Sequence, residues 1–83
     1  MSQANVDVVR RVGEEARKRS KLEPVEYIEA GDDAVLFVFR LVLEIRGTVY
    51  TSHHWWVFGF RDGEMMGWDA YLSEDEARKA AGL

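Results

Sequence analysis

Apolar residues recur at steps of three and four near the start of the chain, which is the spacing of one helical face. This thin stripe consists of Val6, Val9, Val12 and Ala16. Ser2 or Asn5 can cap the helix, and the basic run at 17–19 suits its carboxyl end, where the helix dipole favours positive charge. Because the residue before a proline avoids helical geometry, Pro24 ends the segment, and we predict a helix over residues 1–22.

From residue 24 to residue 72 the apolar positions follow strand spacing, interrupted by turn signals. The predicted turns are Gly31-Asp32-Asp33, Arg46-Gly47 and Asp62-Gly63. Asp-Gly between two apolar runs is the strongest short-range hairpin signal, since a type I′ turn needs positive φ at both central residues. The predicted strands of this four-strand meander are 25–30, 34–45, 48–60 and 64–72.

The last part of the chain predicts a short helix over residues 73–82. Ser73 and Glu76 form a capping box, in which each side chain bonds the backbone N–H of the other residue, and Gly82 ends the helix. The expected fold class is therefore α+β. An N-terminal helix packs on a curved four-stranded antiparallel sheet, and a short C-terminal helix follows.

The two-residue turns also predict which residues share a face of the sheet, because side chains alternate along a strand. The expected cross-strand pairs include Phe37–Trp56, Phe39–His54, Trp56–Asp69 and His54–Tyr71. One face then carries Phe37, Phe39, Leu41, His54, Trp56, Phe58, Met65, Asp69 and Tyr71. The opposite face carries Leu36, Val38, Arg40, Val42, His53, Trp55, Val57, Met66 and Trp68. A slip of one residue in a turn would change these pairs and could reverse a strand.

Both predicted faces are strongly apolar, but only one substantial helix is present to cover them. An exposed apolar face of this size marks an interface. We therefore predict a homodimer that forms through the opposite face, with the N-terminal helix on the first. The predicted interface residues are Val38, Arg40, Trp55, Val57, Met66 and Trp68.

Composition narrows the classes of function. A chain of 83 residues forms one small domain with a marginal core, and the absence of cysteine excludes disulfides and thiolate metal sites. A net charge of −4 without a basic run argues against nucleic-acid binding, and no apolar run approaches the about 20 residues that span a bilayer. With two histidines and no apolar leader segment, we expect no metal, no cofactor and a soluble cytoplasmic protein.

Three segments resemble the SnoaL-like proteins of the nuclear transport factor 2-like (ketosteroid isomerase-like) superfamily. They are VFGFRDGEMMGWDAYLSEDEARKAAGL, EPVEYIEAGDDAVLFVFRL and, at the start, MSQANVDVVRR. The resemblance implies a cone-like α+β barrel with a pocket between its helices and the concave face of its sheet. The family's region between the first helix and the last four strands is absent here. The resemblance therefore implies a single truncated SnoaL-like domain over residues 1–83.

Asp69 is the main candidate for catalysis. On the expected register it lies mid-strand among aromatic side chains, where desolvation would suit general acid or base work. Acidic residues on inward strands are the catalytic base of SnoaL-like cyclases and isomerases, and the resemblance extends this role to Asp69. His54 lies one pair along and could orient a substrate or shuttle a proton. The structural alternatives are a cross-strand hydrogen bond or a position near the rim for Asp69, a bond between His54 and Tyr71, and a surface or interface position for His53.

Five aromatic side chains on the first face could line a pocket for a flat apolar ligand, and core packing under the helix is the alternative. They are Phe37, Phe39, Trp56, Phe58 and Tyr71. The preferred hypothesis is a small homodimeric module that binds a small hydrophobic ligand between helix and sheet without catalysis. Two others stay open: a minimal cyclase or isomerase with Asp69 as general base, and a structural or interaction domain without a pocket.

Overall fold

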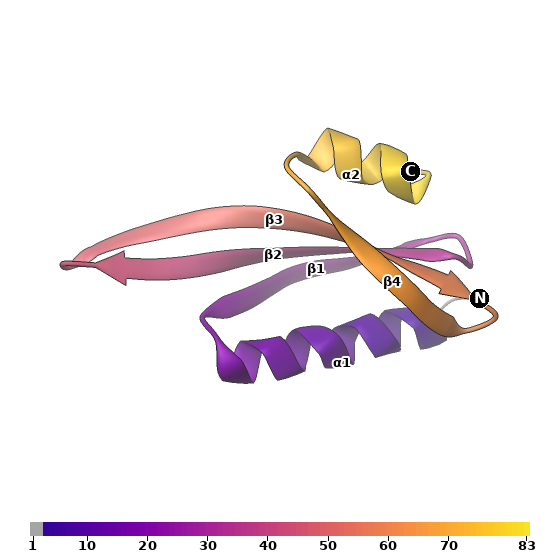
Figure 1. Cartoon of the computed structure of the whole chain (residues 1–83), viewed down its shortest axis with the longest axis horizontal. Coiled ribbons are helices and arrows are strands. Elements are labelled where there is room, and N and C mark those ends of the chain that lie inside the picture. Colours follow the sequence, from indigo (N-terminus) through magenta and orange to yellow (C-terminus); the bar gives the residue numbers. More distant parts are fainter. Residues whose placement is uncertain (1–2) are drawn as a thin grey trace.

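The computed structural model describes residues 3–83 as two helices and one antiparallel sheet (Figure 1). Its elements are α1 (Gln3–Arg19), β1 (Leu22–Ala30), β2 (Ala34–Ile45), β3 (Thr48–Arg61), β4 (Glu64–Tyr71) and α2 (Glu74–Ala81). The strands lie in the order β1-β2-β3-β4. The predicted α+β fold, with a helix, a four-strand meander and a short C-terminal helix, is confirmed.

The ends of α1 differ from the prediction. The helix stops at Arg19 rather than at residue 22. Asn5 lies inside the helix, and its side-chain amide donates a hydrogen bond to the backbone carbonyl of Asp32 (2.9 Å). Asn5 therefore ties α1 to the turn between β1 and β2 instead of capping the helix. The other predicted cap, Ser2, lies outside the described residues.

β1 begins earlier than predicted, at Leu22, and includes Pro24. It is an edge strand, and its pairing with β2 shifts between Pro24 and Glu26. Proline has no N–H to donate to a neighbouring strand, so it is tolerated at such an edge and beside a bulge.

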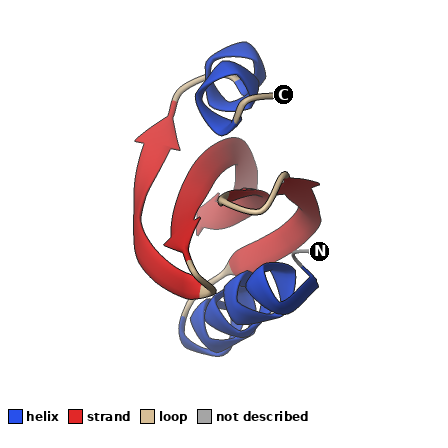
Figure 2. Cartoon of the chain, turned by 90° about the vertical axis from the view of Figure 1, so that its right-hand side faces the viewer, coloured by secondary structure: helices blue, strands red, loops and turns tan. Residues whose placement is uncertain are grey.

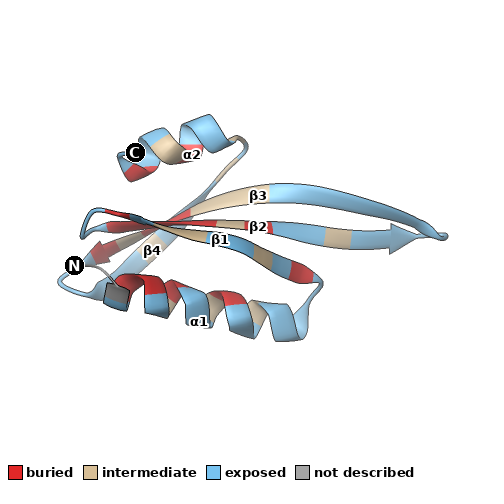
Figure 3. Cartoon of the chain, turned by 180° about the vertical axis from the view of Figure 1, so that it is seen from behind, coloured by how far each residue is buried: buried red, intermediate tan, exposed pale blue. Residues whose placement is uncertain are grey.

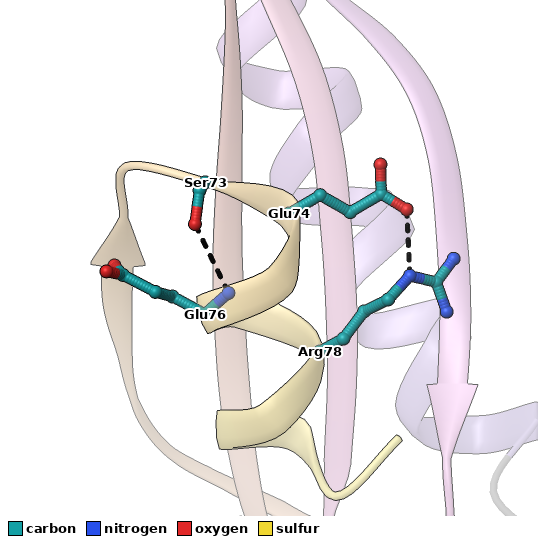
Figure 4. Close-up of polar contacts among 4 residues, drawn as sticks. All are labelled: Ser73, Glu74, Glu76 and Arg78. Carbon is teal, nitrogen blue, oxygen red and sulfur yellow. Dashed lines mark hydrogen bonds and ion pairs between the residues drawn. The ribbon is translucent and has the colours of Figure 1, made fainter.

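Predicted caps are found at both ends of α2. Ser73 Oγ accepts a hydrogen bond from the Glu76 backbone N–H (3.3 Å), whereas the Glu76 side chain extends away from Ser73 (Figure 4). The structure thus contains the Ser73 half of the predicted capping box. At the other end Gly82 is left-handed (φ 83°), and the N–H of Leu83 donates to the carbonyl of Arg78 (2.8 Å), which closes the helix.

The two-residue turns have the predicted geometry. Arg46 and Gly47 have φ of 51° and 82°, and Asp62 and Gly63 have φ of 51° and 83°. Positive φ at both central positions is the signature of a type I′ turn. The β2–β3 register is therefore the predicted one and includes the pairs Phe37–Trp56 and Phe39–His54.

The β3–β4 register departs from the prediction beyond a bulge. Phe60 pairs with Met65 as expected, but the next pair joins Gly59 to Gly67, which leaves Met66 as an extra residue on β4. One extra residue reverses the faces of everything that follows, because side chains alternate with a period of two.

The bulge changes the position of three residues that the sequence placed. The observed pairs are Phe58–Trp68, Val57–Asp69, Trp56–Ala70 and Trp55–Tyr71. The predicted pairs Trp56–Asp69 and His54–Tyr71 are therefore wrong. Trp68 lies on the face that carries Phe37, and Asp69 and Tyr71 lie on the face that carries Leu36.

The two helices cover opposite faces of the sheet (Figure 2), which we call the α1 face and the α2 face. The core on the α1 face consists of Val6, Val9, Leu22, Val35, Phe37, Phe39, Phe58 and Phe60. The smaller core on the α2 face consists of Ala30, Ala34, Leu36, Val57, Ala77 and Ala81. The prediction that the α2 face is left bare for a partner is wrong near α2, because the chain's own C-terminal helix packs there.

β2 and β3 run beyond the rest of the molecule and form an arm, which we define as residues 41–52. β1 begins opposite Leu41, and β4 pairs with β3 only as far as Trp55. The arm is therefore a two-stranded ribbon that projects past both helices and is largely exposed (Figure 3). It gives the molecule principal extents of 46 × 26 × 17 Å.

Candidate functional site

Four aromatic side chains form a continuous row on the α1 face, beside α1. This aromatic row consists of Phe39, His54, Trp56 and Trp68. The rings of Phe39 and His54 stack at 5.2 Å, Trp56 meets Phe39 edge-on at 5.0 Å, and Trp68 stacks on Trp56 at 5.8 Å with an angle of 19° between the planes. Both offset stacking and edge-to-face contact are favourable arrangements of aromatic rings.

The ring contacts give the row the order His54, Phe39, Trp56, Trp68. Phe39 is buried, His54 and Trp56 are half-buried, and Trp68 is 53% exposed. The row thus passes through the core under α1 at Phe39 and ends at the surface on β4 with Trp68. His54 adds a polar group at one end, where its Nε2 lies 3.0 Å from the hydroxyl of Ser52. An apolar surface of rings with one polar group at its end suits a flat ligand that has a polar edge.

Trp68 is the member of the row that was not predicted, because the expected register put this residue on the opposite face. The signal was present in the sequence. Glycine inside a strand often marks a bulge, and Gly59 and Gly67 lie in β3 and β4. A bulge at either glycine would have moved Trp68 to the face of Trp56.

Of the five predicted ligand-binding residues, Trp56 alone belongs to the accessible part of the row. Phe37, Phe39 and Phe58 are 1–2% exposed and pack within the core beneath α1. Tyr71 lies on the α2 face, where it packs against the core formed with α2. The space between α1 and the sheet is filled by the chain's own side chains, so the accessible surface lies beside the helix rather than under it.

The structure does not assemble the predicted catalytic pair. Asp69 is exposed on the α2 face, opposite Val57, so the aromatic surroundings that would desolvate its carboxylate are absent. It lines an open hollow of about 670 Å³ between β4 and the end of α2, together with Lys79. His54 lies on the α1 face. The sheet therefore separates the two residues.

The predicted interface residues are found in several environments. Val57 is buried, and Val38 and Trp55 pack against the core beneath α2. The exposed Arg40 pairs with Glu23 of β1, with 2.6 Å between the Arg40 Nε and a Glu23 carboxylate oxygen. The two remaining residues, Met66 and Trp68, are exposed at and just after the bulge. These six residues do not form one surface.

Tyr27 is the titratable residue most changed by its surroundings. Burial of its ring raises the pKa of the phenol above 10.0, and the nearby Glu14 carboxylate adds to this shift, while Arg10 and Arg17 oppose it. The ring stacks on Phe37 with 4.8 Å between centroids. The hydroxyl oxygen is buried without a hydrogen-bond partner among the described residues. It points into the packing between α1 and the sheet rather than toward the aromatic row.

Within residues 3–83 no group of three or more His, Cys, Asp or Glu side chains could hold a metal ion. Neither helix in this part of the chain is long and apolar enough to cross a membrane. Comparison with protein families, curated proteins and solved structures gave no match to the chain. The resemblance to SnoaL-like proteins therefore stays a prediction.

Proposed function

We propose that the protein is a small binding module that holds a flat apolar ligand against the aromatic row. The observation that supports this function best is the exposed end of the row, where Trp68 is 53% exposed and already stacked on Trp56. Trp68 is not an isolated surface residue but continues a row of packed rings, and covering such an apolar surface is favourable. A flat ligand that lies along the row would cover the exposed parts of Trp68 and Trp56.

The polar end of the row gives the proposed ligand an orientation. His54 and Ser52 are within hydrogen-bond distance of each other at 3.0 Å and can each bond a ligand oxygen or nitrogen. The ligand would then lie with its apolar plane on Trp68 and Trp56 and its polar edge toward His54. A SnoaL-like origin of the chain would agree with this position, since that family binds its ligands on the concave face of the sheet.

Binding without chemistry is the form of the proposal that fits the contacts. A general base must reach the proton that it removes, and Asp69 lies across the sheet from the row. His54 has a hydroxyl neighbour and no carboxylate partner among the contacts described. The proposed module therefore presents or stores its ligand and does not transform it.

The test is a fluorescence titration with menadione, a flat apolar quinone that quenches tryptophan emission. We expect saturable quenching in the native protein and about tenfold weaker binding in Trp68→Ala, which corresponds to the loss of one stacking contact. Met66→Ala is the matched control, because Met66 is 63% exposed on the same strand and lies outside the row. Absence of saturable binding, or equal affinity in Trp68→Ala and the native protein, would refute the proposal.

A further inference from the structure

The two sides of the arm differ in polarity. On the side continuous with the α1 face it carries Leu41, Leu43, Ile45, Thr48, Tyr50 and Ser52, none of them charged. The other side of the arm carries Val42, Glu44, Val49 and Thr51, and Arg40 and His53 follow next to the arm. An antiparallel sheet normally turns its apolar side to a core and its polar side to water. The first side, with the larger apolar side chains and no charge, is therefore the one that favours a covering surface.

No segment among residues 3–83 covers that side. Leu43, Ile45 and Tyr50 are 54%, 49% and 55% exposed. The arm lies beyond the ends of both helices (Figure 1). β1 pairs with β2 only up to Leu41, and β4 pairs with β3 only up to Trp55, so neither strand flanks the arm. An isolated two-stranded hairpin is at best marginally stable in water. An arm of this length therefore needs another surface to pack against.

The surface of the whole chain shows how much area is left to bury. The accessible surface is 5817 Å² for a mass of 9.6 kDa, whereas a compact monomer of this mass exposes about 5,100 Å². The radius of gyration is 13.4 Å, compared with about 11.8 Å for a compact chain of this length. The excess of about 700 Å² is close to the about 800 Å² that each partner contributes to a standard interface.

We propose that the uncharged side of the arm packs against the same side of a second copy of this chain in a two-fold symmetric dimer. A second copy suits the surface because a two-fold contact joins a patch to itself, and an uncharged patch meets its own copy without like-charge repulsion. With the axis near the Leu43–Tyr50 pair, the two arms lie antiparallel and cover each other's exposed leucine, isoleucine and tyrosine side chains. This interface goes beyond ligand binding and needs no ligand to form; it shares Ser52 with the polar end of the proposed ligand site.

The first test compares two glutamates on opposite sides of one arm. Sedimentation equilibrium of the native protein should give a dimer at micromolar concentration. Leu43→Glu should weaken the dimer at least about thirtyfold, the effect of losing one strong interface contact. Thr51→Glu is the matched control, because Thr51 is exposed on the other side of the arm and pairs with Val42, whereas a glutamate at position 49 would face Glu44 directly. Thr51→Glu should leave the dimer intact. Circular dichroism would confirm that both variants fold.

The second test uses the absence of cysteine from the chain, which makes any introduced thiol the only one present. Tyr50→Cys should form a covalent dimer under mild oxidation, and Val49→Cys, one residue away on the other side, should stay reduced. A native protein that is monomeric up to submillimolar concentration would overturn the proposal and leave the arm to a partner of another kind. A native dimer that Leu43→Glu leaves unchanged would overturn the proposed interface.

Discussion

Gly13 in the middle of α1 is explained by the tyrosine that packs against it. Glycine costs a helix interior about 1 kcal/mol relative to alanine. A Cβ atom at position 13 would collide with the Tyr27 hydroxyl oxygen and would lie 3.0 Å from Cζ of Phe37. The absence of a side chain lets α1 approach the sheet closely enough for Tyr27 to stack on Phe37, with the Arg10 guanidinium 4.9 Å above the Tyr27 ring.

Gly13→Ala should therefore destabilise the protein even though alanine is the better helix former. We expect a loss of about 1–3 kcal/mol in the free energy of unfolding, the usual cost of an additional methyl group in a packed site. Urea denaturation followed by circular dichroism measures it. Tyr27→Phe removes the closest atom and one unpartnered buried hydroxyl, so the same Gly13→Ala change should cost less in that background. Stabilisation by Gly13→Ala alone would contradict this explanation.

At the scale of the elements, the bulge in β4 decides which side chains form the aromatic row. Gly67 has a φ of 154°, a conformation that residues with side chains rarely adopt. Its cross-strand neighbour Gly59 has no such restriction, and a Cβ at either position would meet no atom within 4 Å. The two glycines thus differ in backbone conformation and not in available space.

This difference predicts opposite outcomes for the two alanine substitutions. Gly67→Ala should cost about 1–3 kcal/mol of unfolding free energy, the usual range for a strained backbone conformation, and should weaken the near-ultraviolet circular dichroism of the Trp56–Trp68 stack. Gly59→Ala should change neither quantity appreciably. If both variants behaved alike, the conformation of Gly67 would not be what holds the bulge.

At the scale of the whole molecule, two thin cores are joined by one sheet and a third surface is left open. The core under α1 is built from valine, leucine and phenylalanine side chains, and the core under α2 contains four alanines. Small domains bury only about 60% of the surface of the unfolded chain, so each of the two cores contributes modestly to stability. The arm adds length to the sheet but no core of its own, so the proposed dimer would be a source of stability.

Thermal stability should therefore depend on protein concentration. If folding and dimerisation are linked, each tenfold increase in concentration should raise the Tm by about 3–6 °C for a domain of this size. Differential scanning calorimetry over a hundredfold concentration range would measure the shift. Leu43→Glu should remove the dependence, and Thr51→Glu, on the other side of the arm, should keep it. A Tm that is independent of concentration in the native protein would show that folding and dimerisation are not linked.

Features set by neighbouring residues could be predicted from the sequence. Helical periodicity, Ser73, Gly82 and the two type I′ turns each depend on contacts within a few positions, so the order of elements and the whole β2–β3 register followed from them. Phe37, Phe39 and Trp56 were placed on the correct face for this reason. The candidate site was predicted only in part, since the face was right for Trp56 and His54 and wrong for Trp68, Asp69 and Tyr71.

Three features were decided by the tertiary structure alone. The bulge at Met66 depends on how the strands match across the sheet, and a hairpin turn does not determine pairing beyond an irregularity. The face that α2 covers depends on the direction in which the chain leaves β4 and on the twist of the sheet. The open side of the arm depends on where β1 and β4 end relative to β2 and β3. The sequence by itself determined the elements and the turns, because those are local, whereas the site and the exposed surface came from distant segments meeting in space.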